Sequence, residues 1–241
     1  MGANGGEETV MVAVHGAWSS AWAWKKMRPR LAAQGVTLVT PSHTGLGERA
    51  HLARPEVDLE THIADVANVF EYEDLRDVVL VAHSYGGMVA TGVLWRMPER
   101  IRSIVYLDAM VPEPGQCVLD LLAPDAAKAL VEHVDTAGEG WKVPPNPLPA
   151  DTSAADVAWI TPRRGFQPFS TFTQPLKVEG PAPRLARTYV YCQRSGPGDV
   201  FRQFADRARL STDWTLEEID ASHSPHITAP DLLTEVLLRA C

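Results

Sequence analysis

The stretch "LVAHSYGGMVA", residues 80–90, places a serine at the tip of a very tight turn. An apolar run precedes Ser84 and another follows the glycines, so the pattern predicts a strand, a sharp turn and a helix. Ala82 and Gly86, two residues before and after the serine, are small enough for the chain to fold back on itself. A strained turn of this kind exposes a serine hydroxyl above a sheet and points backbone N–H groups into the same space.

Strand and helix patterns alternate on both sides of this turn. Short apolar runs predict strands at 9–16, 36–41, 77–84, 101–109, 187–192 and 214–221. Helical spacing of apolar residues predicts helices at 21–35, 60–75, 86–98, 201–209 and 229–240. This alternation predicts an α/β fold with a mostly parallel central sheet and helices on both faces. Ligand sites in such sheets lie beyond the carboxyl ends of the strands.

The alternation breaks down between residues 111 and 183. This segment holds 12 of the 19 prolines, a density that regular strands do not tolerate. Residues 119–134 have the pattern of one or two helices, whereas 141–183 has the composition of loops. Its five tryptophan and phenylalanine residues argue against a disordered linker between two domains, which is the alternative. We therefore predict a core of residues 1–110 and 184–241 with an inserted cap of residues 111–183.

A serine hydroxyl is a poor nucleophile until a base removes its proton, so the turn requires a histidine partner. In folds with this turn the order along the chain is serine, acid, histidine, and the histidine follows a late strand. "LEEIDASHSPHITAP", residues 216–230, places His223 directly after such a strand and His226 three residues later. The position nearer the strand end favours His223 as the base. A zinc site at the two histidines would lack a third ligand at a recognisable spacing, so we expect no metal.

Two carboxylates are candidates for the acid that orients the histidine. Asp108 ends the predicted strand "IVYLD" next to the turn strand, and a strand end holds a side chain rigidly. Asp199 follows the next core strand in "CQRSGPGDVF", which is the more frequent position in this fold. We favour Asp108 and keep Asp199 as the alternative acid.

A tetrahedral intermediate also needs two hydrogen-bond donors for its oxyanion. One is expected from the backbone N–H of Tyr85, the residue after the serine. The other is expected from the turn after the first strand, "HGAWSS", residues 15–20, where Gly16 permits a close backbone approach. Ala17 is the predicted donor in that turn.

Composition excludes several other classes of protein. The net charge of −8 argues against a nucleic-acid or anionic-membrane partner, and no apolar run approaches the ~20 residues that span a bilayer. The first ten residues carry neither the basic region nor the apolar region of a secretory signal. Cys117, Cys192 and Cys241 are odd in number and widely spaced, which indicates free thiols and a cytoplasmic location. The oligomeric state stays open.

Several stretches of the chain together resemble the α/β-hydrolase fold family. The resemblance rests on "VAVHGAWSSAWAW" (12–24), "TPSHTGLGERAHL" (40–52), "AHSYGG" (82–87), "YLDAMVP" (106–112) and "SHSPHITAP" (222–230). The branch that it most resembles holds plant methyl esterases, hydroxynitrile lyases and bacterial pyrethroid-type carboxylesterases. The resemblance implies for Ser84, His223, Ala17 and Tyr85 the same roles that their positions predict.

Departures from the family pattern narrow the branch. Hydroxynitrile lyases carry a lysine after the catalytic histidine and a hydroxyl residue after the first-strand histidine, whereas this chain has Ser224 and Gly16 there. Relatives with an aspartate nucleophile are excluded by Ser84. Many plant relatives place the acid at the position of Asp199. Bacterial sequences with "YLDA" look as though they place it at the earlier strand end, which is the position of Asp108.

These observations predict a serine carboxylesterase that needs no metal or cofactor. The substrate is expected to be a small to medium, fairly apolar ester that contacts aromatic and apolar residues of the cap. Hydrolysis of a lactone, an amide or a carbon–carbon bond by the same residues is an alternative. A non-catalytic small-molecule receptor on the same fold is a further alternative.

Overall fold

A six-stranded sheet forms the centre of the protein, and every strand pair in it is parallel. The computed structural model describes residues 9–196 and 198–240, so Cys241 lies outside the described residues. The strand order is β2-β1-β3-β4-β7-β8. The strands are β1 (Thr9–Val14), β2 (Val36–Val39), β3 (Val78–His83), β4 (Ile101–Leu107), β7 (Ala186–Cys192) and β8 (Trp214–Ile219). Both the predicted fold class and all six predicted strands are confirmed, with ends that shift by up to two residues.

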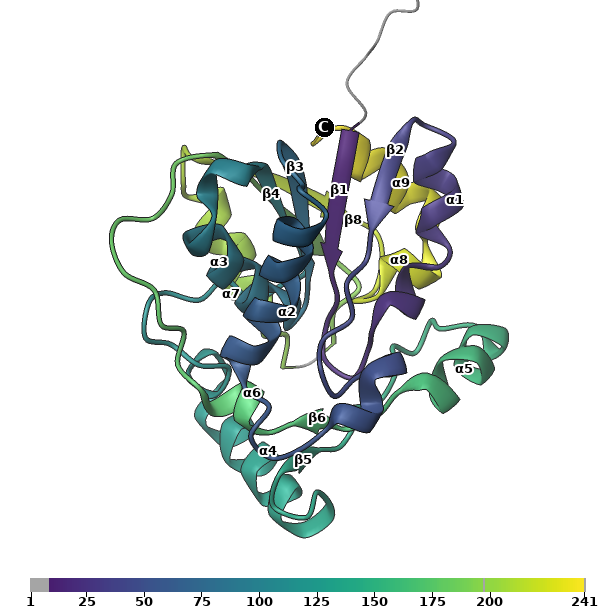
Figure 1. Ribbon diagram of the computed structural model, residues 1–241. Helices are drawn as coiled ribbons and strands as arrows, with labels where there is room; N and C mark the ends of the chain where they lie inside the picture. The colour runs from purple at the N-terminus through teal and green to yellow at the C-terminus, as the bar shows by residue number, and fades with distance from the viewer. Residues whose placement is uncertain (1–8, 197, 241) are drawn as a thin grey trace, which may run out of the picture.

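Helices cover both faces of this sheet (Figure 1). Alternate strand residues point to opposite faces, so Val12 and Leu80 join one buried cluster while Met11 and Val79 join the other. The first cluster packs against α2 (Leu59–Tyr72), α3 (Gly86–Arg96) and α7 (Arg202–Arg209). The second packs against α1 (Met27–Ala32), α8 (Pro225–Thr228) and α9 (Pro230–Leu238). Burial on both faces accounts for the continuous apolar character of the central strands.

The predicted helix at 21–35 is wrong in its length. The structure has a 3-10 turn at Ala21–Trp24 and then the short helix α1. Pro29 is the reason, because proline lacks the N–H of a helix interior and is tolerated only in the first turn. The other 3-10 turns are Gly47–Leu52, Pro98–Arg100, Leu119–Leu121 and Thr161–Arg163.

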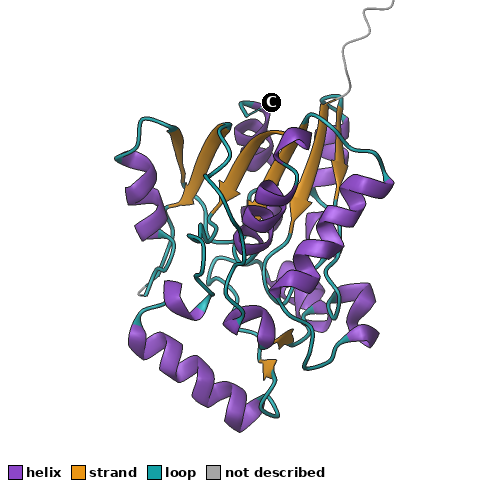
Figure 2. Ribbon diagram, turned by 60° about the vertical axis from the view of Figure 1, so that its left-hand side comes forward, coloured by secondary structure: helices purple, strands orange, loops and turns teal. Residues whose placement is uncertain are grey.

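The segment 111–183, which we call the cap segment, lies beyond the carboxyl ends of the strands (Figures 1 and 2). Its helices and strands are α4 (Pro124–Ala137), β5 (Lys142–Val143), α5 (Ala154–Ile160), β6 (Gln167–Pro168) and α6 (Ser170–Thr173). The expected loop at 141–183 therefore contains two short helices and a two-stranded antiparallel sheet. Elements of two to seven residues are too short for a periodic pattern to reveal. The division into core and cap domains stays a prediction.

Within the described ranges no helix has the length and apolar character needed to cross a membrane.

Candidate active site

Ser84 occupies a strained turn between β3 and α3. Its backbone φ is 56°, in the left-handed region that residues other than glycine rarely adopt. Its carbonyl oxygen accepts hydrogen bonds from the N–H groups of Gly87 at 3.0 Å and Met110 at 3.1 Å. These bonds fix the turn from within α3 and from the loop after β4, so the serine is held although its backbone is strained.

Glycines make this turn possible because other backbone segments pass very close to it. A Cβ atom on Gly86 would lie 2.5 Å from the Val14 carbonyl oxygen, and one on Gly87 would lie 1.8 Å from the Met110 carbonyl oxygen. A Cβ atom on Gly16 would lie 2.8 Å from the Cβ of Ser84. No side chain fits at Gly87, so this position is constrained more tightly than the two small residues that the sequence pattern singled out.

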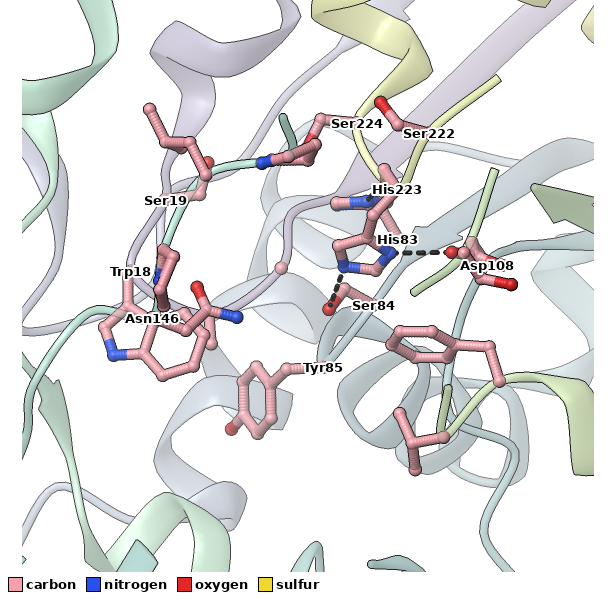
Figure 3. A pocket seen from close by; sticks show the side chains of 18 of the residues that line it. Trp18, Ser19, His83, Ser84, Tyr85, Asp108, Asn146, Ser222, His223 and Ser224 are labelled. Atoms are coloured by element: carbon pink, nitrogen blue, oxygen red, sulfur yellow. Dashed lines mark hydrogen bonds and ion pairs between the residues drawn. The ribbon is translucent and has the colours of Figure 1, made fainter. Parts of the chain in front are cut away.

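Ser84, His223 and Asp108 form a continuous chain of hydrogen bonds. The Nε2 atom of His223 lies 3.0 Å from Oγ of Ser84, and its Nδ1 atom lies 2.7 Å from Oδ2 of Asp108. Figure 3 shows the imidazole between the hydroxyl and the carboxylate, with both bonds drawn. Because Nδ1 donates to the carboxylate, Nε2 is left to accept the serine proton.

The carboxylate of Asp108 is almost completely removed from water. Its residue is 2% exposed, and its Oδ1 accepts a hydrogen bond from the N–H of Cys192 at 3.2 Å. The Asp108 backbone N–H also donates to the Val190 carbonyl at 2.7 Å, which fastens the residue to β7. Burial raises the pKa of Asp108, against the opposing effect of its hydrogen bond from His223. These bonds fix the direction in which the carboxylate meets the imidazole.

Asp199 is placed differently, although it lies at the same cavity. Its Oδ2 accepts from the hydroxyl of Tyr191 at 2.7 Å, and its Oδ1 accepts from the N–H of Phe201 at 2.9 Å. Burial alone would raise the pKa of Asp199, but these hydrogen bonds outweigh it and lower that pKa. The ring of Phe201 stacks on His223 with 4.6 Å between ring centroids. Asp199 therefore supports the face of the imidazole through Phe201, while the bond to Nδ1 comes from Asp108.

Two further histidines pack around His223. His226 is buried and stacks on Trp24 at 4.9 Å, and burial, together with the nearby His223 and His15, lowers its pKa to about 3. His83 donates through Nε2 to the backbone carbonyl of His223 at 2.7 Å. His83 thus ties the His223 loop to the serine turn.

Ala17 and Tyr85 both border the cavity above Ser84. Within the part of the chain that the structure describes, no protein group accepts a hydrogen bond from either backbone N–H. Both donors are therefore free for a ligand oxygen. The next residue, Trp18, has a φ of 57°, so the turn after β1 is also held in the left-handed region.

Three imidazoles that sequence reasoning missed lie stacked near the serine turn. His43 lies between His15, at 3.9 Å, and His62, at 4.6 Å between ring centroids. His15 and His62 are buried, and burial lowers the pKa of each to about 4. His62 donates from Nε2 to the Thr44 carbonyl and accepts at Nδ1 from the hydroxyl of Tyr85, both at 2.9 Å. The neutral imidazole of His62 thus holds the Tyr85 hydroxyl, and His43 and His15 stack in turn on His62. No periodicity connects histidines so far apart in the chain.

A cavity of about 780 Å³ opens above Ser84, between the sheet edge and the cap segment. The apolar side chains from the cap segment that border it include Val118, Leu122, Leu130, Leu148, Ile160 and Phe172. Arg164 is the cap-segment cation at this cavity; its guanidinium binds the carbonyl and amide oxygens of Asn146, each at 2.6 Å. Burial lowers the pKa of Arg164. Nowhere in the described ranges do three or more His, Cys, Asp or Glu side chains gather as metal ligands would.

A parallel α/β sheet with a hydrogen-bonded serine, histidine and carboxylate at its carboxyl edge defines a class of hydrolases. The chain belongs to the alpha/beta hydrolase family, whose sequence profile matches residues 11–236. The resemblance inferred from the sequence is thereby confirmed.

Comparisons with individual proteins agree with this assignment. The chain is 37% identical to a carbendazim hydrolyzing esterase of Nocardioides sp. (strain SG-4G), over 94% of this chain and 97% of that protein. It is 26% identical to a pFDCC methylesterase of Arabidopsis thaliana, over 100% of this chain and 98% of that protein. The structure of an extracellular alpha/beta-hydrolase from a Paenibacillus species superimposes with a TM-score of 0.82 at 24% identity, covering 96% of this chain and 98% of the other.

Proposed function

We propose that the protein is a serine carboxylesterase in which Ser84 is the nucleophile, His223 the general base and Asp108 the orienting acid. One observation carries the proposal: His223 bonds the Ser84 hydroxyl at 3.0 Å and the Asp108 carboxylate at 2.7 Å. Ester hydrolysis, rather than another hydrolytic reaction, is supported by relatives that are esterases and match almost the whole chain.

In the first half of the reaction, Nε2 of His223 takes the proton of Ser84 as Oγ attacks the ester carbonyl carbon. The carbonyl oxygen becomes an oxyanion, which accepts hydrogen bonds from the N–H groups of Ala17 and Tyr85. Collapse of this intermediate breaks the bond to the alkoxy oxygen. His223 returns its proton to that oxygen, so an alcohol leaves and an acyl group stays on Ser84.

In the second half, His223 removes a proton from a water molecule that attacks the acyl carbon. The same N–H groups stabilise the second oxyanion, and the proton on His223 returns to Oγ of Ser84 as the carboxylic acid leaves. Asp108 holds the imidazole in one tautomer and stabilises the imidazolium that forms in both halves.

The cavity supports a small to medium, fairly apolar ester as substrate. Its volume of about 780 Å³ lies within the usual range for small-molecule sites, and its cap side is mainly apolar. The relatives named as a carbendazim hydrolyzing esterase and a pFDCC methylesterase add carbendazim and methyl esters to the candidate substrates. A panel of p-nitrophenyl esters, methyl esters and carbendazim tests this preference.

A cytoplasmic location also belongs to the proposal. Cys117 and Cys192 are buried free thiols, which suit a reducing compartment. Burial raises the pKa of both, which keeps them unreactive. Fractionation of the producing cells tests the location, and recovery of the protein outside the cytoplasm would contradict it.

The Ser84→Ala variant tests the reaction itself. We expect wild-type protein to hydrolyse a short p-nitrophenyl ester and to be labelled by a fluorophosphonate probe, and the variant to lose labelling and at least ~10³ of kcat. Folded wild-type protein that resists labelling would favour a receptor. Labelling without turnover of any ester would favour lactone, amide or carbon–carbon bond hydrolysis.

A further inference from the structure

Trp18, the residue after the Ala17 donor, is held by the cap segment from three directions. Its backbone N–H donates to Oε1 of Gln167 at 3.3 Å, and its indole Nε1 donates to the Val143 carbonyl at 2.9 Å. The guanidinium of Arg164 lies 5.6 Å from the centre of the indole ring, at the distance of a cation–π contact. Figure 3 shows Trp18 beside the cavity, on the opposite side of Ser84 from Asp108.

The Gln167 side chain lies in the interior of the protein and is held there by hydrogen bonds. Its residue is completely buried, and its Nε2 donates to Oγ1 of Thr171 at 2.8 Å. Thr171 in turn donates to the Pro168 carbonyl at 2.6 Å, so its oxygen is left to accept the amide N–H. This sequence of bonds fixes which end of the Gln167 amide faces Trp18. The acceptor of the Trp18 N–H is therefore oriented from within the cap segment.

Both groups that bind Trp18 by hydrogen bonds belong to one small sheet. Val143 on β5 pairs directly with Gln167 on β6. Trp18 has a φ of 57°, a strained conformation that persists only where the surroundings impose it. The cap sheet supplies those surroundings, since it binds the backbone and the side chain of this residue at once.

We propose that Gln167 is a positioning residue for catalysis, which aims the Ala17 N–H at the oxyanion by fixing the Ala17–Trp18 peptide. A peptide unit is planar, so a bond to the Trp18 N–H fixes the plane that also contains the Ala17 carbonyl. The N–H of Ala17 belongs to the preceding peptide unit, which is joined to that plane through the φ and ψ angles of Ala17, so fixing the plane limits the directions in which this N–H can point. This inference rests on the proposed function, because it assigns Ala17 a part in oxyanion stabilisation.

The cap segment thus touches the two proposed oxyanion donors in different ways. Tyr85 is held by the serine turn and by its hydroxyl bond to His62 in the core, and the cap segment meets only its ring, through Phe172 at 5.5 Å between ring centroids. Ala17 is held in addition by the cap sheet through Gln167. The cap segment therefore contributes to the rate of the chemical step as well as to substrate binding.

The Gln167→Met variant removes the acceptor while it keeps the length of the side chain. Removing an oxyanion donor outright lowers kcat by about 10²–10³. A donor that is present but points away from the oxyanion should lower kcat by less. We expect kcat on a short p-nitrophenyl ester to fall about 10- to 30-fold with KM within about threefold, the pattern of an interaction made in the transition state. An alkylboronic acid, which forms a tetrahedral adduct on the serine, should bind more weakly by a similar factor.

Gln174→Met is the matched control, because Gln174 is a second cap glutamine that bonds the core. Its Oε1 accepts from the Glu60 N–H at 2.7 Å, and its Nε2 donates to Asp58 at 2.5 Å, both at α2. This variant loosens the cap segment away from the Ala17 turn. We expect its kcat to stay within about twofold of the wild-type value.

Equal losses of kcat in Gln167→Met and Gln174→Met would overturn the proposal, as would a loss in Gln167→Met confined to KM. Should Gln167→Met fail to fold by circular dichroism, Gln167→Leu decides instead, since it also removes the acceptor of the Trp18 N–H. It should lower kcat about threefold or more with KM unchanged, and an unchanged kcat would overturn the proposal. Failure of the proposed function is distinguishable, because wild-type protein would then lack esterase activity or Ser84→Ala would retain it.

Discussion

The carboxyl edge of the sheet and the cap segment both border the cavity, but they hold their side chains in different ways. At the sheet edge, His83 and Asp108 are at most 5% exposed and are fixed by strand ends and backbone hydrogen bonds. In the cap segment, α4 and α5 each bury a single residue, Val134 and Ile160. The cap is joined to the core largely through side-chain contacts such as Gln167 with Trp18.

This difference separates two requirements of an esterase. The reacting groups need fixed relative positions, and strand ends packed on both sides supply them. The shape of the substrate varies more between relatives than the reaction does, and short elements with few buried contacts change at little cost to stability.

The largest effect is expected at the acid. Asp108→Asn should lower kcat by about 10³–10⁴, because the amide no longer holds the required tautomer of His223. Asp199→Asn, on the loop after β7, should lower kcat less than tenfold, since Asp199 makes its contact with the imidazole through Phe201. Steady-state kinetics of both purified variants measure this. A loss below tenfold in Asp108→Asn, or a larger loss in Asp199→Asn, would reverse the assignment of the two carboxylates.

A backbone substitution should separate the two regions in stability. Gly87→Ala places a Cβ atom 1.8 Å from the Met110 carbonyl oxygen, so the serine turn must shift, at a cost of about 3 kcal/mol in unfolding free energy. Gly165→Ala in the cap segment meets no atom within 4 Å and should change the same quantity by less than about 1 kcal/mol. Urea denaturation compares them. Similar costs at both glycines would show that the cap is packed as rigidly as the sheet edge.

Acid should lower the unfolding free energy of the protein through the buried histidines of its core. Burial holds the pKa of His43 well below its usual value of 6.5, so below that pH the unfolded chain binds a proton that the folded chain does not. The contribution of neutral His43 to the unfolding free energy is therefore fully present above pH 6.5 and is lost as the pH falls below that value. Its ring nitrogens have no partner among the described residues, so His43→Phe removes this acid-sensitive group without removing a ring hydrogen bond.

Relative to wild type, His43→Phe should gain roughly 2 kcal/mol of unfolding free energy between pH 8 and pH 5. Thermal denaturation at the two pH values measures the gain. His133→Phe serves as the comparison, because His133 is an exposed histidine on α4 of the cap segment. The idea that the acid-sensitive groups lie in the core would be abandoned if both variants gained equally.

The smallest effect is expected from the cap lining. Leu130→Trp narrows the cavity, so kcat/KM for a p-nitrophenyl octanoate should fall about tenfold relative to p-nitrophenyl acetate. The acetate value itself should stay within about threefold of wild type, because the reacting groups are untouched. If turnover of both esters fell together, the cap would control the chemical step more broadly than through Gln167.

The sequence predicted the sheet edge well because its signals are local. Buried strands are read from continuous apolar runs, and Ser84, Asp108 and His223 each follow such a run directly. Asp108 is likewise indicated by one short segment, the end of the run "IVYLD". Local patterns of this kind carry most of the fold and of the candidate site.

The short elements within the cap segment and the contacts that support the site escaped prediction, because they depend on residues far apart in the chain. The bond from Trp18 to Gln167 joins residues 149 positions apart, and the stack of His15, His43 and His62 is brought together only by the folded chain. The paired strands β5 and β6 have two residues each. Neither feature has a period, a motif or a spacing that could be read without the tertiary structure.

The residues with positive φ at the cavity also show how far apart the groups of the site lie. Trp18, Ser84 and Asp108 have φ values of 57°, 56° and 42°, and they follow β1, β3 and β4, which are consecutive in the sheet. Neighbouring strands are about 4.8 Å apart, so Ser84 and Asp108, each the first residue after its strand, are separated by about one strand spacing. A new substrate can be accommodated by rebuilding the cap segment outside β5 and β6, whereas the distance between Ser84 and Asp108 can change only if the sheet itself is rebuilt.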